Sequence, residues 1–252
     1  MPKIKTARGE IWFADQRSRR SAPAAILIHG AGGSHLSFPD ELRRHTSWNA
    51  IVPDLPGHGK SAGTGRSQIT DYALDVLALM DALEIKSALL AGHSMGGAIA
   101  QWLALEHRNR TQGLVLICTG ARLPVNPALI DAIVAQPAET TKRLLRWMWS
   151  PDAPTEMVAA SAAILQATAP SVIQRDFTAC AQFDIRARLR DIHAPTLVIA
   201  GEADKMTPPA LSEEIVAKIA NAKLVRLARG SHMAHLEEPS ATATAIRDWL
   251  AA

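Results

Sequence analysis

Short apolar runs alternate with amphipathic helical segments along most of this chain of 252 residues. The apolar runs cover residues 24–28, 49–53, 87–91, 113–118, 195–200 and 222–227. Between them, residues 70–85, 96–108 and 240–252 place their apolar side chains on one helical face. Strands that are apolar on both faces are typical of a parallel sheet that helices cover on each side. We therefore predict an α/β fold with a mostly parallel sheet, preceded by a hairpin over residues 3–14.

Residues 121–192 interrupt this alternation. The stretch contains helix-prone segments separated by prolines and no convincing strand. A segment of this length is too long to be a plain loop between two strands. We therefore expect an inserted helical cap over residues 121–192, on a core formed by residues 1–120 and 193–252. The cap should cover the edge of the sheet where ligands bind.

The composition is that of a folded globular chain, with 48% hydrophobic and 20% charged residues. The 27 Lys and Arg residues and the 24 Asp and Glu residues give a formal net charge of only +3. The longest basic cluster, formed by Arg17, Arg19 and Arg20, is typical of a solvated turn. Nucleic-acid binding normally requires a basic stripe or a recognition module, so we expect no nucleic-acid partner.

Two cysteines, Cys118 and Cys180, stand far apart in apolar surroundings. This pattern is typical of buried thiols in a reducing compartment and not of a disulfide framework. The first residues are charged and alternating, and no apolar run reaches 18 residues. We therefore expect a cytoplasmic protein that does not associate with membranes.

The strongest chemical signal is the sequence AGHSMGG, in which Gly92, Ser94 and Gly96 form a G-x-S-x-G motif. The motif directly follows an apolar strand and directly precedes a helical segment. Glycines in this context allow a sharp strand-to-helix turn that exposes the serine hydroxyl at the helix N-terminus. A glycine-rich turn that merely contains a serine is the alternative. The combination of strand, turn and helix favours a nucleophile at Ser94.

A serine nucleophile needs a base, and the base needs an acid that orients it. Asp204 follows the strand at 195–200, and His232 follows the strand at 222–227. Both loops should reach the same edge of the sheet as Ser94. His235 is the alternative base, but the spacing of the LEEP sequence after it favours His232.

Three motifs together resemble those of the α/β-hydrolase superfamily: HGAGGSH at 29–35, PDLPGHGKS at 53–61 and GHSMGG at 92–97. The chain resembles a cap-bearing serine hydrolase of this superfamily over nearly its whole length. The resemblance implies that Ser94 is the nucleophile, His232 the base and Asp204 its orienting acid. It also implies an oxyanion hole formed by the backbone N–H groups of Ala31 and Met95. The chain departs from the family pattern at Ser231, because members of the family usually have glycine immediately before the base histidine.

Cofactor motifs are incomplete. The GHGKS sequence lacks the first glycine of a phosphate-binding loop, because Asp54 occupies that position. The GAGGSH sequence has His35 where a dinucleotide fingerprint requires Gly or Ala. His232 and His235 have no third metal ligand nearby. We therefore expect neither a cofactor nor a metal.

The segment 143–157 of the expected cap offers side chains for a substrate pocket, namely Trp147, Met148, Trp149 and Met157. They would either line an apolar acyl pocket or pack the small core of the cap itself.

These observations predict a cofactor-independent hydrolase that cleaves small-to-medium carboxylic esters through an acyl-enzyme on Ser94. Thioesters and lactones are alternative substrates for the same chemistry. Carbon–carbon bond hydrolysis is less favoured, since hydrolases of that kind usually carry a G-x-G-P-G loop and this chain has GAGG. A hypothesis of another class is a receptor that holds a small ligand under the cap without turning it over. The expected partner is a small molecule, and no pattern in the chain indicates an oligomeric state.

Overall fold

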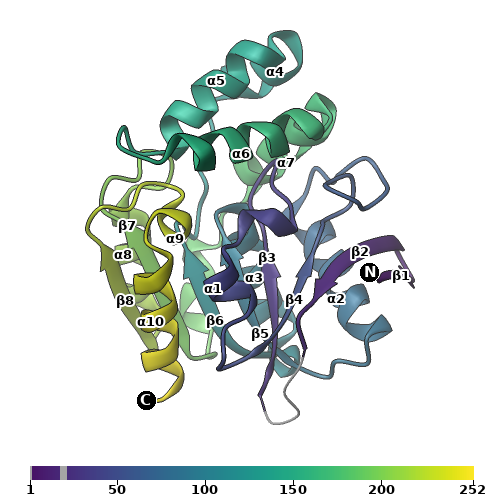
Figure 1. Ribbon diagram of the computed structural model, residues 1–252. Coiled ribbons are helices and arrows are strands. Elements are labelled where there is room, and N and C mark those ends of the chain that lie inside the picture. Colours follow the sequence, from purple (N-terminus) through teal and green to yellow (C-terminus); the bar gives the residue numbers. More distant parts are fainter. Residues whose placement is uncertain (1, 18–21) are drawn as a thin grey trace.

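Eight strands pair in the order β1-β2-β4-β3-β5-β6-β7-β8 within residues 2–17 and 22–252, which are the residues described by the computed structural model. Strands β3 to β8 are all parallel to one another in this sheet. Their bounds are β1 Lys3–Thr6, β2 Gly9–Asp15, β3 Ala24–Ile28, β4 Asn49–Pro53, β5 Ala88–His93, β6 Thr111–Ile117, β7 Thr196–Gly201 and β8 Ala222–Leu227. The predicted α/β fold with a mostly parallel sheet is confirmed (Figure 1).

The predicted N-terminal hairpin is also confirmed. β1 and β2 pair antiparallel with Thr6 opposite Gly9, and β2 then pairs antiparallel with β4. Gly9 has a φ of +135°, a backbone conformation that is open to glycine and costly for other residues. The hairpin therefore extends the parallel sheet at one edge through β2.

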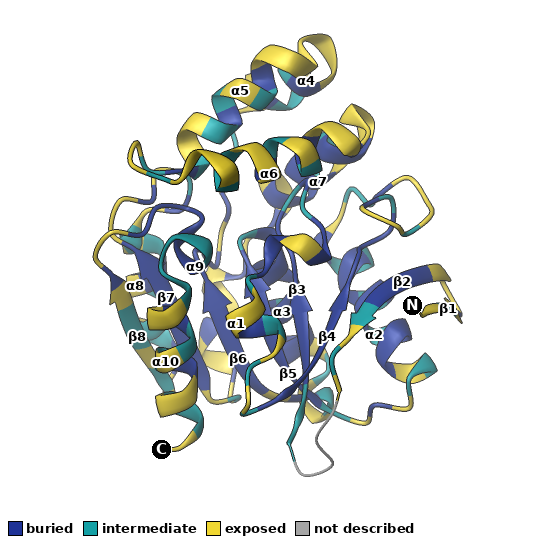
Figure 2. Ribbon diagram, in the orientation of Figure 1, coloured by how far each residue is buried: buried dark blue, intermediate teal, exposed yellow. Residues whose placement is uncertain are grey.

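Successive side chains of the central strands enter two different cores. On β3, Ile26 and Ile28 pack in a cluster with helices α2 (Ile69–Ala82) and α3 (Met95–Glu106). Ala25 and Leu27 pack in a cluster with helices α1 (Asp40–Arg43) and α10 (Pro239–Leu250). This alternation follows from the two-residue period of a strand. Figure 2 shows the result, with the central strands buried between helices that are exposed on their outer sides.

The helices of the core cover both faces of the sheet (Figure 1). Their bounds are α1 Asp40–Arg43, α2 Ile69–Ala82, α3 Met95–Glu106, α8 Pro209–Lys218, α9 Ala234–Glu237 and α10 Pro239–Leu250. Short 3-10 segments occur at η1 His35–Ser37, η2 Arg108–Arg110 and η3 Arg186–Asp191.

Four further helices stand above the carboxyl ends of the parallel strands (Figure 1). They are α4 Pro127–Ala135, α5 Pro137–Met148, α6 Thr155–Ala167 and α7 Pro170–Gln182, and together we call them the cap helices. They share a small apolar cluster that includes Leu129, Ile133 and Phe177. Ala179 and Cys180 of α7, and Ile185, Leu189 and Ile192 downstream of it, pack in the sheet cluster beside α2 and α3. The end of α7 and the segment after it therefore rest on the core of the sheet.

The basic cluster expected in a turn lies only partly within the described residues. Arg17 forms an ion pair with Asp15 at 2.6 Å, whereas Arg19 and Arg20 lie outside the described residues.

Over residues 2–17 and 22–252, none of the helices is by itself both long and apolar enough to cross a membrane. By length and composition alone, α6 and α7 would satisfy this criterion as a pair, with a bend of 100° between them.

Candidate active site

Ser94 lies at the sharp turn between β5 and α3. Its φ of +52° and ψ of −117° fall in a region that residues with a side chain rarely occupy. A side chain on Gly92 would collide with the backbone of Gly96, and one on Gly96 would collide with the backbone of β3. The N–H of Ser94 donates to the carbonyl oxygen of Ile117 at 3.0 Å, and its own carbonyl accepts from the hydroxyl of Thr119 at 2.7 Å. Close packing on both sides thus holds the strained turn.

Asp204 and His232 meet beyond the ends of β7 and β8. His232 Nδ1 lies 2.9 Å from Asp204 Oδ2 and 3.1 Å from Asp204 Oδ1. Asp204 also accepts hydrogen bonds from the backbone N–H groups of Met206 at 2.8 Å and Thr207 at 2.9 Å. The hydroxyl of Thr207 donates to Asp204 Oδ2 at 2.6 Å. These bonds orient the carboxylate towards the imidazole.

The charge state of this pair follows from its surroundings. Burial by itself would raise the pKa of Asp204, but the charge and hydrogen bond of His232 and the hydrogen bonds of Thr207 hold that pKa below its usual range. An ionised Asp204 only accepts hydrogen bonds, so His232 Nδ1 carries the proton in this contact. His232 Nε2 is then left with the free lone pair that a general base requires.

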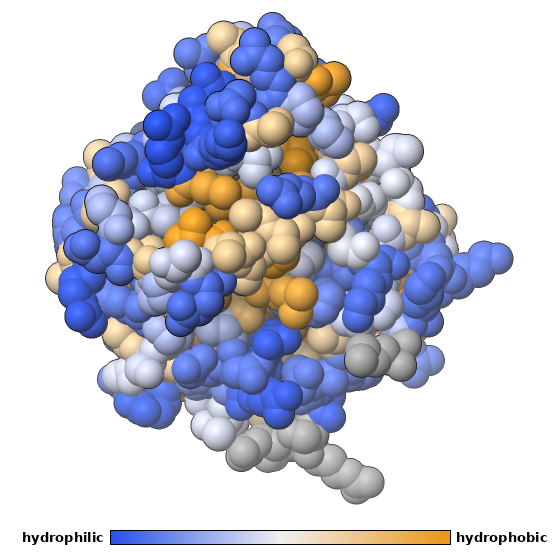
Figure 3. All heavy atoms as spheres, turned by 45° about the horizontal axis from the view of Figure 1, so that its top comes forward, coloured by the Kyte–Doolittle hydropathy of each residue, from blue (hydrophilic) through white to orange (hydrophobic). Residues whose placement is uncertain are grey.

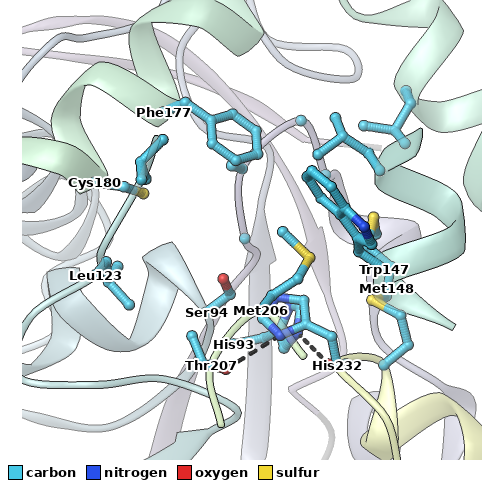
Figure 4. Close-up of a pocket in the computed structure, with 18 of the residues that line it drawn as sticks. His93, Ser94, Leu123, Trp147, Met148, Phe177, Cys180, Met206, Thr207 and His232 are labelled. Carbon is cyan, nitrogen blue, oxygen red and sulfur yellow. Dashed lines mark hydrogen bonds between the residues drawn. The ribbon is translucent and has the colours of Figure 1, made fainter. Parts of the chain in front are cut away.

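A cavity of about 320 Å³ lies above Ser94 and His232. Its apolar lining comes mainly from the cap helices and the segment before them and includes Leu123, Leu129, Leu144, Trp147, Leu165 and Phe177. Figure 4 shows Ser94 and His232 on one side of this cavity, with Phe177 and Trp147 facing them. No residue in 2–17 or 22–252 is hydrogen-bonded to the hydroxyl of Ser94, which is therefore available to a ligand.

The cavity opens to solvent beside the cap helices. Trp147 lines the cavity and is 38% exposed, although large apolar side chains are normally buried. On the face drawn in Figure 3, hydrophobic side chains gather in a band between a hydrophilic upper rim and the hydrophilic lower part of the molecule. An apolar ligand would meet a matching surface at such a band.

The two expected oxyanion donors lie on either side of Ser94 in the fold. Ala31 lines the cavity in the loop after β3, and Met95 is the first residue of α3 with its side chain buried in the core. Within the described residues neither backbone N–H donates a hydrogen bond. For Met95 this is normal, because the first residue of a helix has no acceptor within the helix. A Cβ on Gly30 would lie 3.2 Å from Ser94 Cβ, so the loop that carries Ala31 packs directly against the serine turn.

The histidines near Ser94 take different positions. His93 lines the cavity, and its Nε2 donates to the carbonyl oxygen of His232 at 2.9 Å (Figure 4). His235 lies behind His93 with ring centroids 4.5 Å apart, and its Nε2 donates to the carbonyl oxygen of Ser37 at 2.8 Å. Burial lowers the pKa of His235 to about 4. Because His235 does not reach the cavity, the geometry favours His232 as the base.

The four expected pocket residues of the cap do not lie together. Trp147 and Met148, in the last turn of α5, line the cavity, whereas Trp149 and Met157 do not. Trp149 follows the helix with extended backbone angles, φ −113° and ψ 148°, and its side chain is buried outside the cavity. Met157 lies in the first turn of α6, about a turn before Ser161, where the cavity begins along that helix. The expectation is therefore corrected for Trp149 and Met157.

Three residues in contact with this site were missed by the sequence reasoning. Thr207 follows Asp204 by three residues. Since an aspartate in a turn often accepts hydrogen bonds from the residues that follow it, this contact has a local signal in the sequence. Glu237 accepts from the N–H of Ser231 at 2.5 Å, and Asp176 accepts from the N–H of Gly32 at 2.8 Å. Gly32 and Asp176 are 144 positions apart in the chain, so no local pattern joins them.

Groups of three or more His, Cys, Asp or Glu side chains that could hold a metal ion do not occur in residues 2–17 and 22–252. The chemistry available at the site is that of a hydroxyl, an imidazole, a carboxylate and backbone N–H groups.

Comparison with protein families gives a match to the model described as "Alpha/beta hydrolase family" over residues 25–245. Among curated proteins, the chain is 28% identical to the pimeloyl-[acyl-carrier protein] methyl ester esterase of Neisseria meningitidis serogroup B, over 93% of this chain and 97% of the relative. It is 26% identical to 3-oxoadipate enol-lactonase 1 of Acinetobacter baylyi, over 94% of this chain and 91% of the relative.

Among solved structures, a hydrolase from Pseudomonas aeruginosa PA01 is similar to this chain with a TM-score of 0.89 and 31% identity. The alignment covers 100% of this chain and 98% of that hydrolase. The similarity therefore includes both the sheet and the cap helices.

Proposed function

Because the chain belongs to the alpha/beta hydrolase family, we propose that it is a serine hydrolase that cleaves small-to-medium carboxylic esters through an acyl-enzyme on Ser94. The observation that carries this proposal is the contact of 2.9 Å between His232 Nδ1 and Asp204 Oδ2, below a cavity that both His232 and Ser94 line. The contact leaves His232 Nε2 free on the side of the imidazole that is not held by Asp204.

In the first half of the reaction, Ser94 Oγ forms a bond to the carbonyl carbon of the ester and its proton passes to His232 Nε2. The carbonyl double bond opens, and its oxygen takes the negative charge. That charge is stabilised by the N–H groups of Ala31 and Met95, each worth about 3–4 kcal/mol in comparable sites. The intermediate then collapses, the bond to the alkoxide breaks, and His232 returns the proton to the leaving alcohol.

In the second half, water attacks the acyl-enzyme while His232 Nε2 accepts its proton. The bond between the acyl carbon and Ser94 Oγ breaks, Ser94 regains a proton, and the carboxylic acid leaves. Asp204 remains ionised throughout, because its role is to hold the imidazole in one tautomer and to stabilise the imidazolium.

The apolar lining of the cavity supports an ester with a hydrocarbon acyl or alcohol group. At about 320 Å³ the cavity is at the small end of ligand pockets, which supports substrates of limited length. The relative from Neisseria meningitidis is an esterase, and the relative from Acinetobacter baylyi is a lactonase. Lactone hydrolysis is therefore the second candidate, since it uses the same steps on a cyclic ester.

We further propose that residues 121–192 act as a cap that selects the substrate, with Trp147 and Met148 in contact with the bound chain. The positions of these two side chains on the cavity wall support this role.

A protein of this kind binds a small molecule, and we propose no nucleic acid or membrane as its partner. Both cysteines are free and buried, which supports a location in the reducing cytoplasm. Cell fractionation would test that location.

The first experiment is kcat/KM for nitrophenyl esters from acetyl to dodecanoyl, with Ser94→Ala as the blank. We expect turnover that peaks at a short or medium chain and is absent in Ser94→Ala. A lactone and a thioester of the preferred chain length would rank the alternative substrates. If no ester, lactone or thioester is turned over in a Ser94-dependent way and a fluorophosphonate does not label Ser94, the proposal is wrong. Carbon–carbon bond hydrolysis or ligand binding without turnover is then favoured.

A further inference from the structure

Asp176 is a fully buried carboxylate on α7 that the reaction described above does not use. Its Oδ2 accepts hydrogen bonds from the backbone N–H of Gly32 and from His58 Nε2, both at 2.8 Å. Its Oδ1 accepts from the hydroxyl of Tyr72. The three donors belong to the loop after β3, the loop after β4 and helix α2. One cap side chain therefore binds three separate segments of the core.

Gly32 directly follows Ala31, the proposed oxyanion donor. Gly32 has a φ of +64°, and a Cβ at this position would lie 2.6 Å from Leu165 Cδ2 of α6. The next residue, Gly33, donates its N–H to the carbonyl oxygen of Gly30 at 3.1 Å. The loop from Gly30 to Gly33 is thus a tight turn with the cap helices packed on it. Within this turn, the N–H of Gly32 donates to Asp176.

The acceptor oxygen of the Gly32 hydrogen bond also accepts from His58. Burial opposes a charge on His58, but the charge and hydrogen bond of Asp176 raise the pKa of His58 above its ordinary value. The other ionisable groups that act on His58 are Asp54 and the ring of His29, whose centroid lies 4.9 Å away. Gly32 therefore donates to a fully buried carboxyl group that His58 and Tyr72 also hold in place, so the position of its N–H is restricted.

We propose that Asp176 is a positioning residue for the oxyanion hole, which through the N–H of Gly32 fixes the loop that carries the N–H of Ala31. The proposal rests on the proposed function, since it assigns a role within that site. Fixing the peptide group between Ala31 and Gly32 restricts the backbone on the carboxyl side of Ala31. The hole is then complete only when α7 is seated on the core.

A merely structural role and a positioning role differ in what they change. Loss of a structural contact lowers stability and the fraction of folded protein, but each folded molecule keeps its kcat. A displaced oxyanion donor lowers kcat and leaves KM nearly unchanged, because the donor acts mainly on charge that develops in the transition state. It also weakens binding of an alkyl boronic acid, whose adduct with Ser94 resembles the tetrahedral intermediate.

The test compares Asp176→Ala and Asp176→Asn with Thr178→Val. Thr178 lies on the same helix, and its hydroxyl donates only to the carbonyl of Gln174 within α7, at 2.8 Å. Active sites are counted with a fluorophosphonate, and kcat, KM and the inhibition constant of the boronic acid are measured for each protein.

We expect kcat of Asp176→Ala to fall by about 10- to 100-fold, as small displacements of catalytic groups do elsewhere. KM should stay within about twofold and the boronic acid should bind more weakly by a factor similar to the loss in kcat. Asp176→Asn, which retains one acceptor oxygen, should lie between Asp176→Ala and the unsubstituted protein. Thr178→Val should match the unsubstituted protein. Should Asp176→Ala not fold, Asp176→Asn carries the comparison.

A folded Asp176 variant with unchanged kcat and unchanged boronic acid affinity would overturn the proposal while leaving the esterase function intact. If the unsubstituted protein turns over no ester at all, the proposed function fails instead. Hydrogen exchange of the amides in residues 30–34 then still tests the contact. It should be faster in Asp176→Asn than in Thr178→Val, and equal rates would overturn the role of Asp176.

Discussion

The hydroxyl of Ser231, the residue before His232, lies 2.7 Å from the carbonyl oxygen of Met148 at the end of α5. The same hydroxyl lies 2.7 Å from Glu237 Oε2, and Glu237 Oε1 accepts from the N–H of Ser150 at 2.9 Å. The N–H of Met233 also donates to the carbonyl of Met148, at 3.1 Å. The loop that carries the proposed base is therefore hydrogen-bonded on both sides of His232 to the part of the cap that lines the cavity.

Ser231→Gly tests this connection, since it removes the hydroxyl and restores the residue that is usual in the family. We expect kcat/KM for the preferred, longer ester to fall by about 3- to 10-fold, the value of one net hydrogen bond, because the end of α5 with Trp147 and Met148 is then held less firmly. The acetyl ester should change less, because a shorter chain makes fewer contacts with the cap. Ser231→Ala is the control that removes the hydroxyl without adding the backbone freedom of glycine. Equal losses on the short and the long ester would contradict this prediction.

Ser94→Ala should abolish multiple turnover and leave the fold intact, because the hydroxyl projects into the cavity. Ser94→Gly should be equally inactive but more stable than Ser94→Ala, by about 1–2 kcal/mol in the free energy of unfolding. The reason is the φ of +52° at this position, which glycine adopts without strain. Chemical denaturation of the two variants measures the difference. A glycine variant no more stable than the alanine variant would show that the turn carries no such strain.

Asp204→Asn should lower kcat by about 10⁴-fold, because the amide no longer holds His232 in the tautomer that leaves Nε2 free. Thr207→Val removes only the hydroxyl that donates to Asp204 Oδ2 at 2.6 Å, while Asp204 keeps both backbone N–H donors. We therefore expect a smaller loss in kcat for Thr207→Val, of about 10-fold, the value of one hydrogen bond to a charged group. Steady-state kinetics with active-site counting checks this order. Near-full activity of Asp204→Asn would mean that another residue orients the base.

Because His29, His93 and His235 are buried, we expect the protein to lose stability in mild acid. Burial lowers the pKa values of His29 and His235 to about 4 and that of His93 well below its ordinary value. Between pH 6.5 and about 4 these side chains gain protons in the unfolded chain but not in the folded one. The free energy of unfolding therefore falls as pH falls, by about 1.4 kcal/mol per pH unit for each such histidine at full effect.

Urea denaturation at pH 7, 6 and 5 measures this dependence, and His235→Gln should make it less steep. The contribution of His58 to the free energy of unfolding has the opposite dependence on pH. Its folded-state pKa is raised, so its stabilisation is complete below the unfolded pKa of about 6.5 and is lost as pH rises through the folded value. Unfolding free energies that are constant from pH 7 to pH 5 would contradict the burial of these histidines in neutral form.

The α/β architecture and the serine turn could be predicted from the sequence because both depend on neighbouring residues. The period of apolar side chains distinguishes strands from helices. The turn at Ser94 depends on Gly92 and Gly96, two residues away on either side, where the backbone leaves no room for a side chain. Parallel strands place their carboxyl ends at one edge, so loops far apart in the chain were expected to meet there. The family and the solved hydrolase agree with this architecture.

Only the tertiary structure decided how the cap helices meet that edge. Nothing near Trp149 or Met157 in the chain reveals that the cavity ends before them, because that depends on how α5 and α6 pack. The bond from Gly32 to Asp176 spans 144 positions and that from Ser231 to Met148 spans 83. The sequence by itself determined the strands, the helices and the order of Ser94, Asp204 and His232, since local periodicity and turn chemistry carry that information. The contacts of the cap with Gly32 and Ser231 were decided by packing, because a buried polar group bonds to whichever donor or acceptor the folded chain brings within reach.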